Sequence, residues 1–188
     1  MPDTRPPVIA AIVTRASGDA NRLIADFAVR QQAAGWRIRG LIQEQPACDD
    51  GCRIFVVDLD DGTRYPITQD LGPGAESCGL DPSLIAEASR VMRRIASEGA
   101  DLAVFNRFGG LEAEGGGFAA EMLSLMAGGI PVLAIVPDRH LAQWREFTGG
   151  LAAELAPTGK ALDDWFLAMM GSAPQQSAEP TAESRHRP

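Results

Sequence analysis

The chain has little that would suit a membrane or a secreted protein. Nowhere in its 188 residues do about 18 apolar residues follow one another, as a membrane-spanning helix requires. The first residues, 1–15, show no basic stretch followed by an apolar core and a small-residue cleavage site. We therefore expect a cytoplasmic protein.

Positive charge is also scarce. The sequence holds 17 Lys and Arg against 25 Asp and Glu, which gives a net charge of −8. Nucleic acids and anionic lipid surfaces are polyanions and repel such a protein. This balance argues against a nucleic-acid or membrane partner, and it favours a small ligand or another protein.

Cysteine and histidine are few, with three and two residues respectively. An odd number of cysteines in a chain long enough to bury a core favours reduced thiols. Cys48 and Cys52 form a Cys-x-x-x-Cys pair, and with Cys78 they could ligate a metal or oxidise reversibly. The spacing is not a known zinc pattern, and incidental structural cysteines are the simplest interpretation.

Strands alternate with helices along most of the chain, which predicts one α/β domain over residues 1–170. The last residues, 171–188, are a polar Pro/Ser/Glu tail that we expect to be disordered. Apolar, β-rich runs predict buried parallel strands, and a hairpin closed by Asp60-Asp61-Gly62 is expected as an insertion. The expected strands are Val8–Val13, Arg37–Gln43, Arg53–Leu59, Arg64–Thr68, Asp101–Phe105 and Ile130–Val136. The expected helices are Ala20–Ala34, a segment from Asp81-Pro82 to about Ser97, Phe118–Ala127, Leu141–Leu155 and Ala161–Met169.

A mostly parallel sheet with helices on both faces binds its ligands beyond the carboxyl ends of its strands. Two loops meet that condition, Thr14–Asn21 and Asn106–Gly117. The first resembles a degenerate phosphate-binding loop of the P-loop nucleoside-triphosphatase class. Gly18 stands at its second glycine, but Asp19 replaces the lysine and would repel a polyphosphate by about 1–4 kcal/mol at ~4 Å.

What remains in the first loop is a helix N-terminus flanked by Thr14, Arg15, Ser17 and Asn21. Free N–H groups and partial positive charge at such a terminus suit a small oxyanion. The simpler interpretation is that Ser17 or Asp19 only caps the helix.

The second loop resembles the metal-binding region of a small bacterial and archaeal nucleoside-triphosphatase family. That family has Asp-Glu at the end of a strand, followed by a hydrophobic residue, Gly, two residues and Glu. Gly109 and Glu112 match, whereas Asn106 and Arg107 replace the two acids. An amide holds Mg²⁺ poorly and a guanidinium cannot activate water, so Mg-nucleotide is an unlikely ligand.

Most of the chain, from about Val8 to Leu155, also resembles an uncharacterised bacterial family whose genes lie beside molybdate-uptake genes. The match is carried by Gln69–Gly74, Cys78–Pro82, Asn106–Gly109 and Glu112. The resemblance implies a role in molybdenum homeostasis, with molybdate or tungstate as ligand and molybdate-transport or molybdenum-cofactor proteins as partners. Arg15 and Arg107 are the cationic groups that would recognise the anion.

The leading hypothesis from the sequence is a non-hydrolytic, P-loop-like protein that binds an oxyanion or a metal-containing ligand. A divergent nucleotide-dependent phosphohydrolase or transferase is an alternative, with Glu112 as its acid or base. The third possibility is a regulatory module that binds a protein partner and no ligand.

Overall fold

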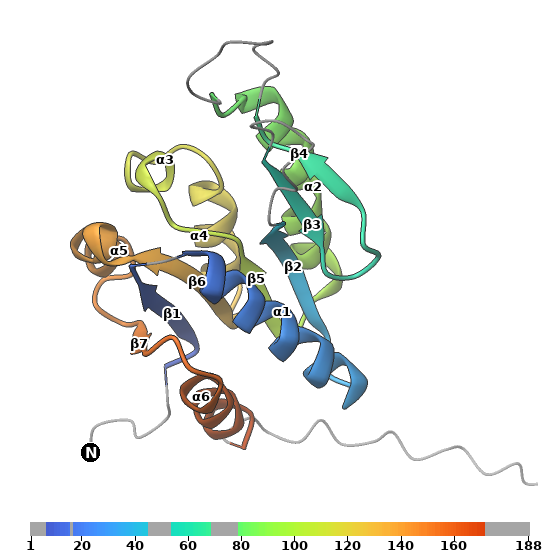
Figure 1. Cartoon of the computed structure of the whole chain (residues 1–188), viewed down its shortest axis with the longest axis vertical. Helices are drawn as coiled ribbons and strands as arrows, with labels where there is room; N and C mark the ends of the chain where they lie inside the picture. Colours follow the sequence, from blue (N-terminus) through green and yellow to red (C-terminus); the bar gives the residue numbers. More distant parts are fainter. Residues whose placement is uncertain (1–6, 16, 45–53, 69–78, 172–188) are drawn as a thin grey trace, which may run out of the picture.

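The computed structural model describes residues 7–15, 17–44, 54–68 and 79–171 of the chain. These residues form a sheet of seven strands in the order β4-β3-β2-β5-β6-β1-β7 (Figure 1). The strands are β1 (Ile9–Thr14), β2 (Ile38–Gln43), β3 (Phe55–Asp58), β4 (Arg64–Pro66), β5 (Leu102–Phe105), β6 (Val132–Pro137) and β7 (Ala153–Leu155).

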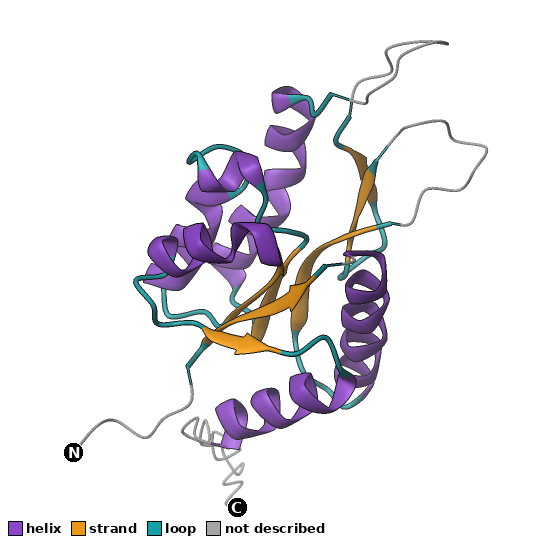
Figure 2. Ribbon diagram, turned by 60° about the vertical axis from the view of Figure 1, so that its left-hand side comes forward, coloured by secondary structure: helices purple, strands orange, loops and turns teal. Residues whose placement is uncertain are grey.

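Helices cover both faces of the sheet, as Figure 2 shows. Each face of the sheet has its own hydrophobic core. The helices α1 and α6 pack on one face, whereas α2, α4 and α5 pack on the other. The helices are α1 (Ser17–Ala33), α2 (Pro82–Glu98), α3 (Gly110–Ala113), α4 (Ala119–Ala127), α5 (Leu141–Phe147) and α6 (Gly159–Gly171).

The central strands are buried on both faces because their side chains alternate between the two cores. In β5, Leu102 and Val104 belong to the core under α1 and α6, whereas Ala103 and Phe105 belong to the opposite core. All four residues are fully buried. A strand of this kind has a continuous apolar sequence, which is why it could be recognised from the sequence.

The sheet is parallel at its centre and antiparallel at one edge. β2, β5, β6, β1 and β7 pair in parallel, and β3 pairs antiparallel with both β2 and β4. The predicted α/β class, the helices on both faces and the hairpin insertion are therefore confirmed. The hairpin turns at Gly62, whose φ of +75° suits glycine.

The predicted helix over Leu141–Leu155 is wrong in its second half. The helix α5 ends at Phe147, and Gly149 and Gly150 follow with φ of +61° and +73°. The chain then enters β7, which pairs in parallel with β1. Two consecutive glycines in the left-handed region terminate the helix, and the residues that follow form hydrogen bonds with the free edge of β1.

Two smaller differences concern the loops. The helix α1 begins at Ser17, three residues before the expected start, so Ser17 and Gly18 belong to its first turn. The loop Asn106–Gly117 contains the short helix α3. The three cysteines, the run Gln69–Gly74 and the tail from residue 172 lie outside the described residues. In the described part of the chain, no helix has the length and apolar character needed to cross a membrane.

Candidate functional site

Three parallel strands end at the same edge of the sheet. The last residue of β1, Thr14, lies beside Pro137, the last residue of β6, and Phe105 of β5 lies beside Ala134 of β6. The loops that follow β1, β5 and β6 therefore meet at this edge, where ligands of parallel α/β sheets are generally bound.

The loop after β1 is tied to the loop after β6 by an ion pair. Arg15 Nε donates to Asp138 Oδ2 at 3.1 Å, although the Arg15 side chain is 92% exposed. An exposed pair of this kind contributes little to stability. It does mean that Arg15, which the sequence offered as a ligand-binding cation, already has a carboxylate partner.

Arg107 occupies a different setting. It is partly buried, and among the described residues no hydrogen bond or ion pair is formed by its guanidinium. It lines a cavity of about 310 Å³ beyond the end of β5. The other lining residues are Gln43, Ile54, Ile67, Leu80, Ile85, Asn106, Gly109, Gly110, Leu111, Glu112, Phe118 and Arg139.

The surroundings of Arg107 disfavour its positive charge, so a bound anion would stabilise it. Burial lowers the pKa of the Arg107 guanidinium, the charge of Arg139 lowers it further, and Glu112 partly offsets both. A guanidinium nevertheless stays protonated in proteins. Two cations that line one cavity are stabilised when an anion enters between them.

Phe108 holds the main chain next to Arg107 against the sheet. It is fully buried, its N–H donates to the Ile135 carbonyl at 2.9 Å, and its ring packs edge-on against Trp144 with centroids 5.2 Å apart. Phe147 adds a second ring contact at 5.1 Å. Because Phe108 is held by packing on the sheet, the main chain from which the Arg107 side chain extends is held beside the cavity.

Asn106 brings an unsatisfied polar group to the same cavity. It is 8% exposed, and its buried Oδ1 has no partner among the described residues. Asn21, in α1, is 5% exposed and also has a buried, unpartnered Oδ1. A buried amide oxygen without a partner is rare, and because it is an acceptor it would be satisfied by a water molecule or another donor and not by an anion.

Glu112 holds the loop that carries these residues. Its Oε2 accepts from the Gly109 N–H at 2.9 Å and its Oε1 from the Phe118 N–H at 3.2 Å. The side chain is 8% exposed. These bonds close the loop from the end of β5 to the start of α4, so the geometry favours a structural role for Glu112 over proton transfer.

The acidic turn of the hairpin is explained by an ion pair. Arg94 Nη2 lies 2.7 Å from Asp58 Oδ2, and the Asp58 side chain is fully buried. Arg94 also lies 3.4 Å from Asp60. Within the described ranges, no cluster of three or more His, Cys, Asp or Glu residues could hold a metal ion. The predicted turn, rather than a cation site, accounts for these acids.

Sequence reasoning missed Arg139 and His140, which follow β6. Arg139 Nε donates to His140 Nε2 at 3.3 Å, and Arg139 lines the cavity with Arg107. The rule that pointed to the loops after β1 and β5 applies equally to the loop after the predicted strand Ile130–Val136. Applying it there would have found Arg139.

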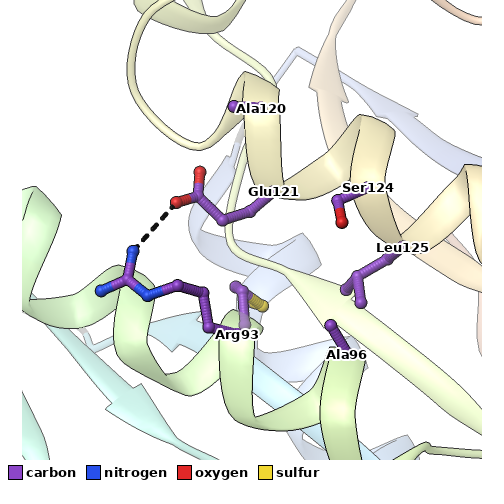
Figure 3. Close-up of a pocket in the computed structure, with 7 residues that line it drawn as sticks. Arg93, Ala96, Ala120, Glu121, Ser124 and Leu125 are labelled. Atoms are coloured by element: carbon purple, nitrogen blue, oxygen red, sulfur yellow. Dashed lines mark hydrogen bonds and ion pairs between the residues drawn. The ribbon is translucent and has the colours of Figure 1, made fainter.

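Two further hollows lie between α2 and α4. One measures about 750 Å³ and shares Leu80, Ile85 and Leu111 with the Arg107 cavity. The other is smaller, about 170 Å³. Figure 3 shows Arg93 and Glu121 facing each other across this smaller hollow, 3.5 Å apart. Because their opposite charges pair, Arg93 is not an unpaired cation in this hollow.

A family model described as a protein of unknown function (DUF2478) matches residues 9–165. The chain belongs to this family. That places it in the uncharacterised family that the sequence resemblance pointed to.

One curated relative is the Molybdenum import ATP-binding protein ModC 2 of Bradyrhizobium diazoefficiens. It is 36% identical over 163 residues, which make up 86% of this chain but 18% of the relative. The chain thus spans less than a fifth of the length of the curated relative that it matches.

Two solved structures share the fold. A human cancer-related nucleoside triphosphatase has a TM-score of 0.67 at 17% identity, covering 88% of this chain and 98% of its own. THEP1 from Aquifex aeolicus has a TM-score of 0.61 at 15% identity, covering 84% and 94%. The predicted P-loop nucleoside-triphosphatase-like fold is therefore confirmed. At these identities the likeness concerns the fold alone.

Proposed function

We propose that this domain binds an anion without hydrolysing nucleotides, at the cavity lined by Asn106, Arg107 and Arg139. The proposed ligand is an oxyanion such as molybdate or tungstate, or an anion that contains the metal. The observation that carries the proposal is Arg107, a partly buried guanidinium on a cavity wall that forms no hydrogen bond or ion pair among the described residues, with the charge of Glu112 only partly offsetting its burial and the charge of Arg139.

The chemistry of the cavity supports binding over hydrolysis. Nucleotide hydrolysis on this fold needs a carboxylate to hold Mg²⁺ and another group to orient water. Asn106 and Arg107 stand where those acids are expected, and Asp19 stands where the phosphate-loop lysine is expected. Each substitution weakens Mg-nucleotide binding, whereas Arg107 and Arg139 favour a smaller anion.

The relative's name supports a molybdenum context. A segment similar to this chain forms part of a larger protein named for molybdenum import. We propose that the domain serves the same process, either beside a molybdate-transport ATPase or with a protein of molybdenum-cofactor assembly. In that setting, anion occupancy of the cavity would report the supply of the oxyanion to its partner.

Isothermal titration calorimetry tests the proposal. Molybdate, tungstate, sulfate and inorganic phosphate are titrated into the wild type and into Arg107→Ala, Arg139→Ala and Arg90→Ala. Arg90 is a matched control, since it is an exposed arginine paired with Glu87 on α2. We expect binding of at least one anion, lost in Arg107→Ala, weakened in Arg139→Ala and unchanged in Arg90→Ala.

Nucleotide binding is tested in parallel. Mg-ATP and Mg-GTP at millimolar concentration are expected to leave the melting temperature unchanged. Binding by none of the four anions would refute the proposal, and strong stabilisation by a Mg-nucleotide would favour the enzymatic alternative.

A further inference from the structure

We infer that the ligand of the Arg107 cavity is an organic anion, in which a phosphate-like or carboxylate head is carried on an apolar body. This inference rests on the proposed function, because it takes anion binding at Arg107 and Arg139 as given. It narrows that proposal, because the ligand is then an organic anion whose charged head occupies the place of a bare oxyanion such as molybdate.

The size of the cavity is the first reason. Its volume of about 310 Å³ is roughly ten times the ~30 Å³ that one water molecule occupies in the liquid. It falls at the lower end of the range of about 300–1,000 Å³ that is typical of pockets for organic small molecules. A tetrahedral oxyanion seated between the arginines would leave most of this volume to water.

The second reason is the character of the walls. The polar side of the cavity is provided by Gln43, Asn106, Arg107, Glu112 and Arg139, and the apolar side by Ile54, Ile67, Leu80, Ile85, Leu111 and Phe118. Leu80 and Leu111 on that wall are 45% and 36% exposed. Removing their apolar surface from water contributes about 25 cal/mol per Å². A bare oxyanion cannot use that contribution, whereas a ring or an aliphatic group can.

The third reason is the neighbouring hollow of about 750 Å³. Leu80, Ile85 and Leu111 line both spaces, so the second hollow continues the apolar wall of the first. Further on, the hollow is lined by Pro82, Ala86 and Ala120 together with the polar side chains of Ser89, Arg93 and Glu121. The body of the ligand can therefore lie along the shared apolar wall of Leu80, Ile85 and Leu111, on the side of the cavity that faces the second hollow.

These features place the two halves of the ligand. The head lies between Arg107 and Arg139, where its charge is matched by the two guanidinium groups. The body lies against Leu80, Ile85 and Leu111. Pockets that combine a few convergent polar groups with an apolar wall are typical sites for such ligands.

Calorimetry with three simple probes tests the inference: inorganic phosphate, phenyl phosphate and phenol. Inorganic phosphate represents the charged head alone, phenol the apolar body alone, and phenyl phosphate the two joined. Each is titrated into the wild type, Arg107→Ala, Leu111→Ser and Leu167→Ser. Leu167 is the matched control, because it is 64% exposed and lies on α6, which packs on the opposite face of the sheet.

We expect phenyl phosphate to bind at least about tenfold more tightly than inorganic phosphate, since the ring buries apolar surface that the bare anion does not. Leu111→Ser should weaken phenyl phosphate and leave inorganic phosphate unchanged, while Leu167→Ser changes neither. Arg107→Ala should abolish binding of both phosphates, and phenol should not bind measurably.

The outcomes separate this inference from the proposed function. If inorganic phosphate or molybdate binds the wild type as tightly as phenyl phosphate, the inference is wrong and the proposed function stands. If no anion binds at all, both the inference and the proposed function are refuted. The affinities of the wild type for phenyl phosphate and inorganic phosphate test the inference even if a variant fails to fold.

Discussion

The carboxylate of Glu112 fills the space that a side chain on Gly117 would need. A Cβ placed on Gly117 would overlap Glu112 Oε1, and Gly117 has a φ of +56° that itself favours glycine. The same oxygen accepts the N–H of Phe118, and the other accepts that of Gly109. Glu112, which lines the Arg107 cavity, and Gly117, which lines the neighbouring larger hollow, thus form one closely packed unit.

Loss of the Glu112 carboxylate should destabilise the protein. Glu112→Ala leaves the N–H groups of Gly109 and Phe118 without acceptors, so we expect the free energy of unfolding to fall by about 2–4 kcal/mol. Glu112→Gln should cause a smaller loss, because its amide offers one acceptor in place of two. Urea unfolding followed by circular dichroism measures both. Glu114→Ala, an exposed control on the same loop, should change little, and an equal loss in that control would contradict the role assigned to Glu112.

Arg107 should reduce the stability of the empty protein. It is partly buried beside Arg139, and burial and that neighbour both lower its pKa. We expect Arg107→Met to leave the unfolding free energy unchanged or raise it by up to about 1 kcal/mol, since the charge is only partly buried. Differential scanning calorimetry in an anion-free buffer measures this.

A contrasting variant is Arg145→Met, which breaks the two-bond pair between Arg145 and Glu154 at 2.6 and 2.8 Å. It should lower the melting temperature. If Arg107→Met lowered it by as much, Arg107 would have to be a structural residue and not a ligand-binding one.

Gly40 should tolerate no side chain. Its φ is +136°, and a Cβ at this position would overlap the main chain of Val104 in the adjacent strand β5. We expect Gly40→Ala to cost more than about 3 kcal/mol, or to prevent folding, because β2 and β5 would have to separate.

Gly35→Ala isolates the backbone contribution to that effect. Gly35 has a φ of +94°, but a Cβ at this position would meet no atom within 4 Å. The substitution should cost only about 1–2 kcal/mol. Similar losses from the two variants, measured by chemical unfolding, would argue against close strand contact at Gly40.

The pair between Arg145 and Glu154 should make stability depend on pH. The Arg145 hydrogen bond lowers the pKa of Glu154 in the folded protein. A depressed carboxyl pKa contributes stability that is present above the unfolded pKa of about 4.3 and is lost as the pH falls through the folded value. The difference in unfolding free energy between wild type and Glu154→Gln should therefore hold steady from about pH 5 to 7, where the Glu154 carboxyl is ionised in both the folded and the unfolded state, and shrink toward about pH 3.

Chemical unfolding across this pH range measures the effect. The double variant Arg145→Met/Glu154→Gln should show little loss beyond either single variant, because both remove the same interaction. A difference that grew as the pH fell would have the wrong sign for this pair.

The sequence alone determined the α/β class, the hairpin and most element positions. The reason is that buried central strands such as β5 and β6 are continuous apolar runs, and caps such as Asp81 and Gly99 mark the ends of α2. Asp81 accepts from the Ser83 N–H, as its place before Pro82 indicated. These signals are local and can be recognised along the chain.

Tertiary structure alone decided the rest. The strand β7 exists because β1 has a free edge for Ala153–Leu155, and no local pattern encodes that pairing. Arg15, Arg107 and Arg139 look alike in sequence, since each follows a strand. Only the folded protein pairs Arg15 with Asp138, partly buries Arg107 with no ion pair in the described part of the chain, and sets Arg139 on the same cavity. Charge partners and cavity walls come from segments far apart in the chain, so their arrangement is fixed by packing and not by local sequence.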